Sequence, residues 1–279
     1  MFFQKYKQGK TASKIKIEKC KKNIKGTEVS FIPDDTIFEK TLFSPKKLYE
    51  FIKMKSVLVN KTSISFNVDK SLIKDSTPAK DIFFYKNGIE EYLKETSNIK
   101  SKLFTNNFCI KSDLNNNEKL EVVIIFNKNE KSKLMSYCNT IETPDGGSHE
   151  NALKNGLLKS IKMYGKKNQF SKINNVNIND IIDYSDIIIS IFINEPSFEG
   201  QTKKRIVMPK LQIKVEDVVQ SEFLKWLNSN KKNANKLLDT FIERSLLRTD
   251  LHKIKELERK TIKEKNLLPG KLVDCSSKN

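Results

Sequence analysis

The run "DIIISIFIN" at residues 186–194 limits the folds open to this chain more than any other feature. Its apolar residues, most of them β-branched, form a short stretch that is typical of a buried strand. We therefore predict a core strand over 187–193. Two earlier segments have the same character, and they predict strands in "LEVVIIFNKN" (120–129) and "KLMSYCNTIETP" (133–144), adjacent to each other and joined by the polar turn "KNEKS".

A helix is predicted between the second of these strands and the core strand. The segment "TPDGG" (143–147) breaks the strand, and Ser148 can cap the helix. Glu150 lies in the first turn, where its negative charge interacts favourably with the positive end of the helix dipole. Gly165 is expected to end the helix. With a second short helix at 178–184, the order strand, helix, strand predicts an α+β layered fold. The buried stripe of the long helix is predicted to consist of Leu153, Leu157, Ile161 and Tyr164.

The first 72 residues predict a separate strand, helix and strand. Residues 26–35, "GTEVSFIPDD", alternate apolar and polar positions after a glycine, as a strand does. Residues 44–58, "SPKKLYEFIKMKSVL", begin with Ser-Pro and keep apolar residues at helical spacing. Residues 61–69, "KTSISFNVD", predict another short strand.

The last third of the chain is helical in pattern. Apolar residues recur at helical spacing over 219–227, a break falls at 228–233, and the pattern restarts at Ala234. From Arg244 onward the helix is mostly charged. We expect it to be long and either exposed or packed on something outside this chain.

The net charge of +18 favours a polyanionic partner, nucleic acid first. The alternative is that the many lysines only form a solvated surface. The four cysteines lack paired spacing and only two histidines accompany them, so we expect reduced thiols and no metal site. No apolar run approaches the roughly 18 to 20 residues that span a bilayer, and the first residues lack an apolar signal core. We therefore expect a cytoplasmic protein.

The stretch "FEGQTKKR" at 198–205 follows the core strand and has two interpretations. It is either a solvated basic loop or a loop that binds a phosphate. Lysine offers a compact cation to a phosphate, a glutamine amide can donate a hydrogen bond beside it, and Gly200 permits close approach of the backbone.

Three motifs give the chain a family resemblance. "TPDGGSHE", "FEGQTK" and "LPGKLVDCSS" follow one another in the order and at the intervals found in the B subunits of bacterial type IIA DNA topoisomerases, DNA gyrase and topoisomerase IV. The segments "FINEPSFEGQTK", "FLKWL" and "LLDTFIERSL" look closer to the topoisomerase IV members. "QKYKQGK" and "GTEVSFIPD" resemble the last part of that family's ATP-binding domain, of the GHKL type shared by gyrase, Hsp90, histidine kinases and MutL. The resemblance covers essentially the whole chain.

The resemblance implies an α+β fold in three parts. Residues 1–75 would be the end of a GHKL-type ATPase α/β sandwich. Residues 76–258 would be a transducer domain, with a ribosomal-protein-type left-handed βαβ fold and long C-terminal helices as a tail at 216–258. Residues 259–279 would be a linker and the truncated start of a TOPRIM domain.

The resemblance also implies site residues for ATP. Gln201 and Lys203 match the family's Gln-Thr-Lys loop, which reaches the γ-phosphate, so that this interaction favours the docked state before hydrolysis and is lost after it. Thr27 matches a threonine that helps to hold the adenine, although a plain strand threonine is the alternative. For His149 we expect a role in the turn and helix cap and not in catalysis.

Several family motifs do not occur in this sequence. The hydrolytic glutamate, the magnesium-holding asparagine, the D-x-G-x-G motif and the metal-binding E-G-D-S-A-G-G and D-x-D motifs are not among its 279 residues. The resemblance implies ATP and Mg²⁺ for the full-length protein. We expect this chain alone to bind no cofactor, to have no catalytic residue and to hydrolyse no ATP.

The family resemblance implies three partners: double-stranded DNA, a second B subunit and the topoisomerase's A subunit. It implies no membrane partner. The sequence also leaves open a stand-alone basic nucleic-acid-binding protein that reuses the transducer fold. A MutL-like repair ATPase is the other alternative, and "LPGKLVDCSS" argues against it. Cations of the helical region are the predicted DNA contacts: Lys225, Lys231, Lys232, Lys236, Arg244, Arg248 and Lys253.

Overall fold

The computed structural model describes residues 1–19, 25–115, 117–129 and 132–265. The chain divides into two compact units: residues 1–52 with 66–81, and residues 53–65 with the remainder from Ile82 onward. Residues 266–279, which hold the motif "LPGKLVDCSS" of the predicted TOPRIM start, lie outside the described residues. Within them, no helix combines the length and apolar character needed to cross a membrane.

Short strands and one long helix make up the first unit. The predicted helix at 44–58 is confirmed, as is a strand within 61–69, whose Phe66 is buried against Tyr49 in an edge-to-face contact. Helix α1 and strands β5 and β6 continue into the second unit. The bounds are β1 Phe2–Phe3, β2 Tyr6–Lys7, β3 Lys10–Thr11, β4 Lys16–Ile17, α1 Pro45–Leu58, β5 Ile64–Asn67, η1 Lys70–Leu72 and β6 Lys80–Phe83.

The strand predicted at residues 26–35 is wrong. The segment has no regular secondary structure, and Val29 and Phe31 are 79% and 70% exposed. Alternation of apolar residues indicates a strand only where a neighbouring strand can form its hydrogen bonds, and none of the described strands pairs with this segment.

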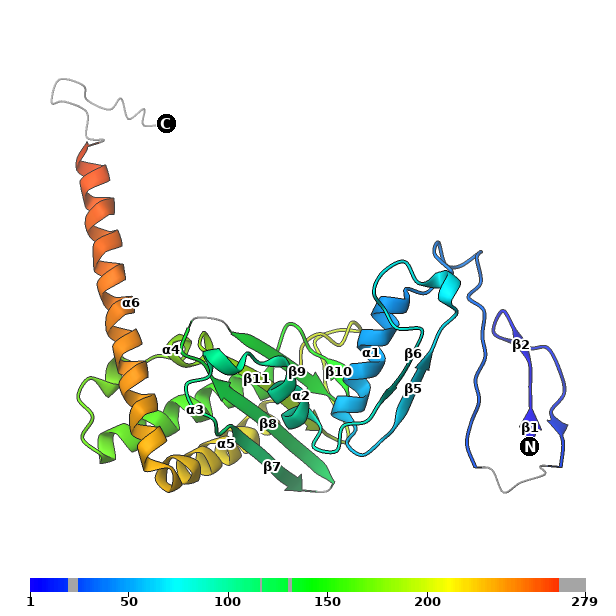
Figure 1. Cartoon of the computed structure of the whole chain (residues 1–279), viewed down its shortest axis with the longest axis horizontal. Coiled ribbons are helices and arrows are strands. Elements are labelled where there is room, and N and C mark those ends of the chain that lie inside the picture. Colours follow the sequence, from blue (N-terminus) through cyan, green and yellow to red (C-terminus); the bar gives the residue numbers. More distant parts are fainter. Residues whose placement is uncertain (20–24, 116, 130–131, 266–279) are drawn as a thin grey trace, which may run out of the picture. The chain divides into compact units, whose positions relative to one another are not determined.

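A five-stranded mixed sheet forms the centre of the second unit, in the order β10-β9-β11-β8-β7 (Figure 1). The central strand β11 runs antiparallel to β8, with Ile187 opposite Ile124, and parallel to β9, with Ile187 opposite Leu134. The bounds are β7 Phe108–Asn115, β8 Glu118–Phe126, β9 Lys133–Cys138, β10 Ile141–Glu142 and β11 Ser185–Phe192.

The predicted adjacency of the strands at 120–129 and 133–144 is wrong, because β11 lies between β8 and β9. The physical reason lies in the apolar run that forms β11. A strand that is apolar at nearly every position is most stable where both of its faces and both of its edges are covered. The position between β8 and β9 provides that environment, and Ile187, Ile188 and Ile189 are fully buried there.

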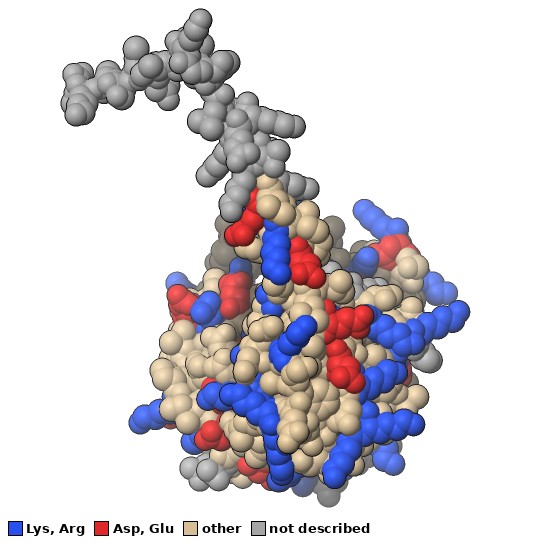
Figure 2. All heavy atoms as spheres, turned by 90° about the vertical axis from the view of Figure 1, so that its left-hand side faces the viewer, with Lys and Arg blue, Asp and Glu red and all other residues tan. Residues whose placement is uncertain are grey.

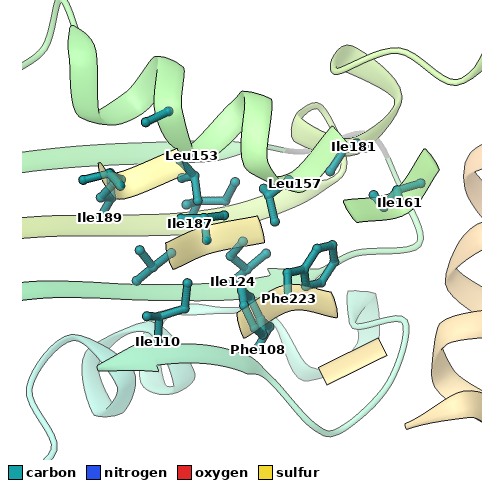
Figure 3. Close-up of a cluster of buried hydrophobic side chains, with 14 of the residues drawn as sticks. Phe108, Ile110, Ile124, Leu153, Leu157, Ile161, Ile181, Ile187, Ile189 and Phe223 are labelled. Atoms are coloured by element: carbon teal, nitrogen blue, oxygen red, sulfur yellow. The ribbon is translucent and has the colours of Figure 1, made fainter. Parts of the chain in front are cut away.

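Two long helices cover one face of the sheet. Alternate residues of β11 point to opposite faces, and Ile187 and Ile189 belong to the core beneath α3 and α5 (Figure 3). Asp186, on the other face, accepts a hydrogen bond from Ser97 at the end of α2. The bounds are α2 Ile89–Thr96, η2 Ile99–Ser101, α3 Ser148–Lys167, η3 Ile173–Asn175, α4 Asn179–Ile182, α5 Pro209–Ser229 and α6 Lys231–Lys265.

The predicted stripe of α3 is confirmed: its four members are all buried. Gly165 does not end the helix, which continues to Lys167. A Cβ at Gly165 would lie 2.4 Å from a side-chain carbon of Ile173, so the missing side chain makes room for the η3 turn. The same reasoning applies to Gly156, where a Cβ would lie 2.9 Å from the Glu216 carbonyl oxygen of α5.

The predicted break between the C-terminal helices is confirmed, with α5 ending at Ser229 and α6 starting at Lys231. The first turns of α6 are buried in the core through Ala234, Leu238 and Phe241. From Asp250 onward its described side chains are exposed, and the helix projects from the rest of its unit (Figure 1).

Candidate functional site

The segment predicted as a phosphate-binding loop is a closed hairpin, here called the 198–206 hairpin. Phe198 and Ile206 face each other as an antiparallel bridge. The Glu199 amide donates to the Arg205 carbonyl oxygen at 2.9 Å, and their side chains form an ion pair at 3.3 Å. The two arms therefore hold the tip, residues 200–204, in a defined shape.

The tip presents Gln201 and Lys203 to solvent. Gly200 and Lys203 both have positive φ, at 85° and 56°, and the Lys203 amide donates to the Gly200 carbonyl oxygen at 3.3 Å. A left-handed conformation at lysine is uncommon and is found in turns and functional loops. Within the described part of the chain, neither Lys203 nor Lys204 forms an ion pair with an acidic side chain. The Lys203 ammonium is thus available to an anion.

The hairpin is hydrogen-bonded to the turn that precedes α3. The Asp145 amide donates to the Lys204 carbonyl oxygen at 3.1 Å, and the Ile206 amide donates to the Gly146 carbonyl oxygen at 3.1 Å. The Ser148 amide donates to the Ile206 carbonyl oxygen at 3.0 Å. The motifs "TPDGGSHE" and "FEGQTK", far apart in sequence, are therefore neighbours in space.

Ser148 does not cap α3 as predicted. Gly147 is the N-cap residue, and the Ser148 hydroxyl, in the first turn, instead accepts a hydrogen bond from the Met208 amide at 2.8 Å. The reason is the nearby chain from Ile206 to Pro209, which brings a backbone amide without a helical partner to this hydroxyl. A capping pattern in sequence cannot reveal such a competing donor.

His149 lies in the interior and has no exposed surface. Its Nε2 is 3.2 Å from Thr143 Oγ1, which is itself 2.9 Å from Ser136 Oγ on β9. Burial lowers the pKa of His149 to about 4, so the ring is neutral near pH 7. A neutral, enclosed imidazole has a structural role in the turn.

Thr27, the predicted adenine contact, belongs to the first compact unit, whereas Gln201 and Lys203 belong to the second. Thr27 is exposed and lies in a segment without regular secondary structure. Among the described residues, no group of three or more His, Cys, Asp and Glu side chains is placed to hold a metal ion.

Arg244, one of the predicted DNA contacts, is buried. Its guanidinium lies 3.5 Å from the ring centre of Tyr184 and donates to the Asn127 carbonyl oxygen at 2.7 Å. Burial lowers the pKa of Arg244 to about 10, which leaves it charged at neutral pH. The prediction of Arg244 as a DNA contact is wrong, because the side chain is buried. Helical spacing alone does not show which face of the helix carries this arginine.

The other predicted DNA contacts are more accessible. Arg248 is partly exposed and makes a paired contact with Asp180, at 2.9 and 3.1 Å. Lys225 forms an exposed ion pair with Glu222 on α5, and Lys253 forms one with Asp250 on α6. The view in Figure 2 shows Lys and Arg side chains gathered around the base of α6, whereas both signs of charge occur along its projecting part. The remaining cations of the set are Lys231, Lys232 and Lys236.

Comparison with known proteins identifies the family of this chain. A family model described as DNA gyrase B matches residues 88–257, more than half of the chain. The chain therefore belongs to the DNA gyrase B family, the B subunits of type IIA DNA topoisomerases. The resemblance inferred from the motifs is confirmed.

Within this family the chain is more similar to a topoisomerase IV subunit than to a gyrase subunit that it also matches. It is 36% identical to the B subunit of DNA topoisomerase 4 from Rickettsia bellii over 99% of this chain and 42% of that protein. It is 28% identical to the B subunit of DNA gyrase from Clostridium acetobutylicum over 99% of this chain and 43% of that protein. The chain thus spans about two-fifths of the length of these relatives.

Solved structures share the fold. The topoisomerase IV ATP-binding domain of Francisella tularensis, in complex with a small-molecule inhibitor, has a TM-score of 0.72 and 24% identity, over 89% of this chain and 66% of that one. The 43K ATPase domain of Thermus thermophilus gyrase B has a TM-score of 0.65 and 22% identity, over 81% and 59%.

Proposed function

We propose that this chain is the part of a topoisomerase IV B subunit that senses the γ-phosphate of ATP and couples it to DNA strand passage. The observation that carries the proposal is the 198–206 hairpin, whose tip presents Gln201 and Lys203 to solvent on a hydrogen-bonded base. The Lys203 ammonium would pair with the terminal phosphate, and the Gln201 amide would donate beside it.

The coupling would run through the helices that follow the hairpin. Helix α5 begins at Pro209, directly after it, and packs against α3 through Gly156 and through Ser160, whose hydroxyl donates to the Gln220 carbonyl oxygen at 3.0 Å. The Tyr164 hydroxyl then donates to Asn235 of α6 at 3.2 Å. A change in the position of the hairpin would therefore move α3, α5 and α6 together.

In this proposal the parts of the chain keep the roles expected from the family. Residues 1–75 would complete a GHKL ATPase domain, in which Thr27 contacts the adenine. Residues 76–258 would be the transducer. Its βαβ unit would consist of β9, α3 and β11, in which β9 and β11 lie parallel and side by side, with the left-handed crossover that the family resemblance implies. Residues 259–279 would lead into a TOPRIM domain.

The whole enzyme would be an ATP-hydrolysing isomerase that uses Mg²⁺ and assembles from two B subunits with A subunits on double-stranded DNA. This chain by itself would not hydrolyse ATP, because the family's general-base and metal-binding motifs are not among its residues.

The test compares Lys203→Ala with Lys204→Ala in a full-length B subunit that carries this segment, in complex with the A subunit. Removal of the phosphate interaction by Lys203→Ala should cost about 1.5 to 3 kcal/mol, or roughly 10- to 150-fold in ATP-dependent strand passage. Lys204→Ala is the matched control, because it removes an adjacent exposed cation. Equal effects of the two variants would refute the sensor role.

A further inference from the structure

One side chain of α3 contacts the base of the 198–206 hairpin, in addition to its backbone hydrogen bonds. Met208 lies between the hairpin and α5, and its amide is the N-cap amide of α5. The side chain of Met208 does not cap that helix. The amide instead donates to the Ser148 hydroxyl at 2.8 Å. The Ser148 hydroxyl is thus a side-chain contact at the point where the hairpin ends and α5 begins, beside the backbone hydrogen bonds described above.

The neighbouring Gly147 makes this contact possible. Its φ is 128°, and a Cβ there would lie 2.2 Å from the Ile206 carbonyl oxygen and 2.6 Å from the Ile206 nitrogen. Any larger residue at position 147 would push the arm of the hairpin away. The close approach permits two further hydrogen bonds: the Ser148 amide donates to the Ile206 carbonyl oxygen, and the Ile206 amide donates to the Gly146 carbonyl oxygen.

The turn itself is anchored to the sheet. Thr143 and Ser136 exchange hydrogen bonds: the Thr143 amide donates to the Ser136 carbonyl oxygen at 2.9 Å, and the Ser136 hydroxyl donates to the Thr143 carbonyl oxygen at 2.8 Å. The Nε2 atom of His149 lies within hydrogen-bond distance of the Thr143 hydroxyl. The hairpin is thus connected, through the turn, to strand β9.

We infer that Gly147 and Ser148 are positioning residues for the phosphate-sensing tip: they hold the hairpin where Gln201 and Lys203 can reach the nucleotide, and they transmit its displacement to α3. This inference rests on the proposed function. Without the Ser148 hydroxyl, the hairpin spends only part of its time in the competent position, and the apparent affinity for ATP falls by that fraction.

The experiment compares Ser148→Ala with Ser185→Ala, its matched control, in the same full-length B subunit. Both serines are buried and each hydroxyl bonds to a backbone group, but the Ser185 hydroxyl donates to the Ile181 carbonyl oxygen at 2.7 Å, away from the hairpin and from the α3–α5 contact. Both variants should lower the melting temperature similarly. Only Ser148→Ala should raise the KM for ATP in strand passage, by about fivefold with little change in kcat, as expected for removal of one neutral hydrogen bond.

Amide hydrogen exchange in the purified chain supplies a direct readout. Ser148→Ala should remove the protection of the Met208 amide and speed exchange in the hairpin, and Ser148→Thr, which keeps a hydroxyl, should restore protection. Unchanged protection of the Met208 amide, or an equal KM for ATP in Ser148→Ala and Ser185→Ala, would overturn the inference. Failure of the Lys203→Ala test would instead reject the proposed function, so the two failures are distinguishable.

Discussion

At the residue scale, His149 is a buried base that stays neutral in the folded protein. Its pKa is lowered from 6.5 to about 4 by burial, and its hydrogen-bond partner, Thr143, carries no charge. Below pH 6.5 the unfolded chain binds a proton at this ring, whereas the folded chain does so only near pH 4. The free energy of unfolding should therefore fall as the pH decreases through this window.

We predict a loss of roughly 2 kcal/mol between pH 7.5 and pH 5, since one pKa unit corresponds to about 1.4 kcal/mol. Urea unfolding at several pH values measures it. His149→Gln serves as the control, because a glutamine does not titrate and its stability curve should be flatter over this range. Parallel curves for the two proteins would contradict the assignment.

The sequence predicted the exposed loop of the candidate site but not the surroundings of two other residues. A glycine and three cations after an apolar run mark an exposed loop, and Gln201 and Lys203 are exposed in it, whereas their role at a phosphate stays a prediction. The surroundings of Ser148 and Arg244 were not predictable, because they depend on groups distant in sequence. The Met208 amide binds the first, and Tyr184 with the Asn127 carbonyl encloses the second.

At the element scale, the contact between α3 and α5 leaves no space at Gly156. A Cβ there would lie 2.9 Å from both the Glu216 carbonyl oxygen and a side-chain carbon of Val219. Glycine normally destabilises a helix interior by about 1 kcal/mol relative to alanine. Here the close approach of the two helices should outweigh that preference.

Gly156→Ala should consequently destabilise the chain by about 1 to 3 kcal/mol, the usual range for overpacking. Asn151→Ala, at an exposed position of α3, should be neutral or slightly stabilising. Thermal or urea unfolding of both variants measures the change in the free energy of unfolding, and the two changes should differ in sign or magnitude. A more stable Gly156→Ala protein would show that the helices can separate without cost.

The existence of the elements was easier to predict than their arrangement. Helical spacing and strand composition depend on nearby residues, and α1, α3, α5 and α6 were all anticipated. The order of strands in the sheet was not, because β8 and β9 carry no local mark that a later strand will lie between them. The strand expected at 26–35 failed for the related reason that pairing requires a partner.

At the scale of the whole molecule, the excess of positive charge favours contact with the phosphates of a DNA duplex. Arg244 is buried and does not contribute. If the remaining predicted cations bind DNA, the purified chain should bind unrelated duplexes weakly, at about 10⁻⁴ to 10⁻⁶ M at physiological salt, and lose affinity steeply as salt rises.

A binding titration across a salt series tests this prediction with two triple variants of equal charge change. The salt slope is the slope of the logarithm of the binding constant against the logarithm of the salt concentration. Replacing Lys225, Lys231 and Lys232 by alanine should reduce its magnitude by roughly 0.9 for each phosphate that is no longer neutralised. Replacing Lys7, Lys10 and Lys14, exposed cations of the first unit, should leave the slope unchanged. A marked sequence preference, or equal slopes for the two variants, would assign the charge to another partner.

The position of β11 between β8 and β9 has a consequence for synthesis of the protein. Strand β9 leaves the ribosome well before β11, with the whole of α3 made between them. Until β11 emerges, the edges of β8 and β9 that it will join have unpaired backbone groups, which are the kind of surface that associates with other chains. The sheet can close only after residue 192 has been translated, so these edges stay open to association with other chains throughout the synthesis of α3.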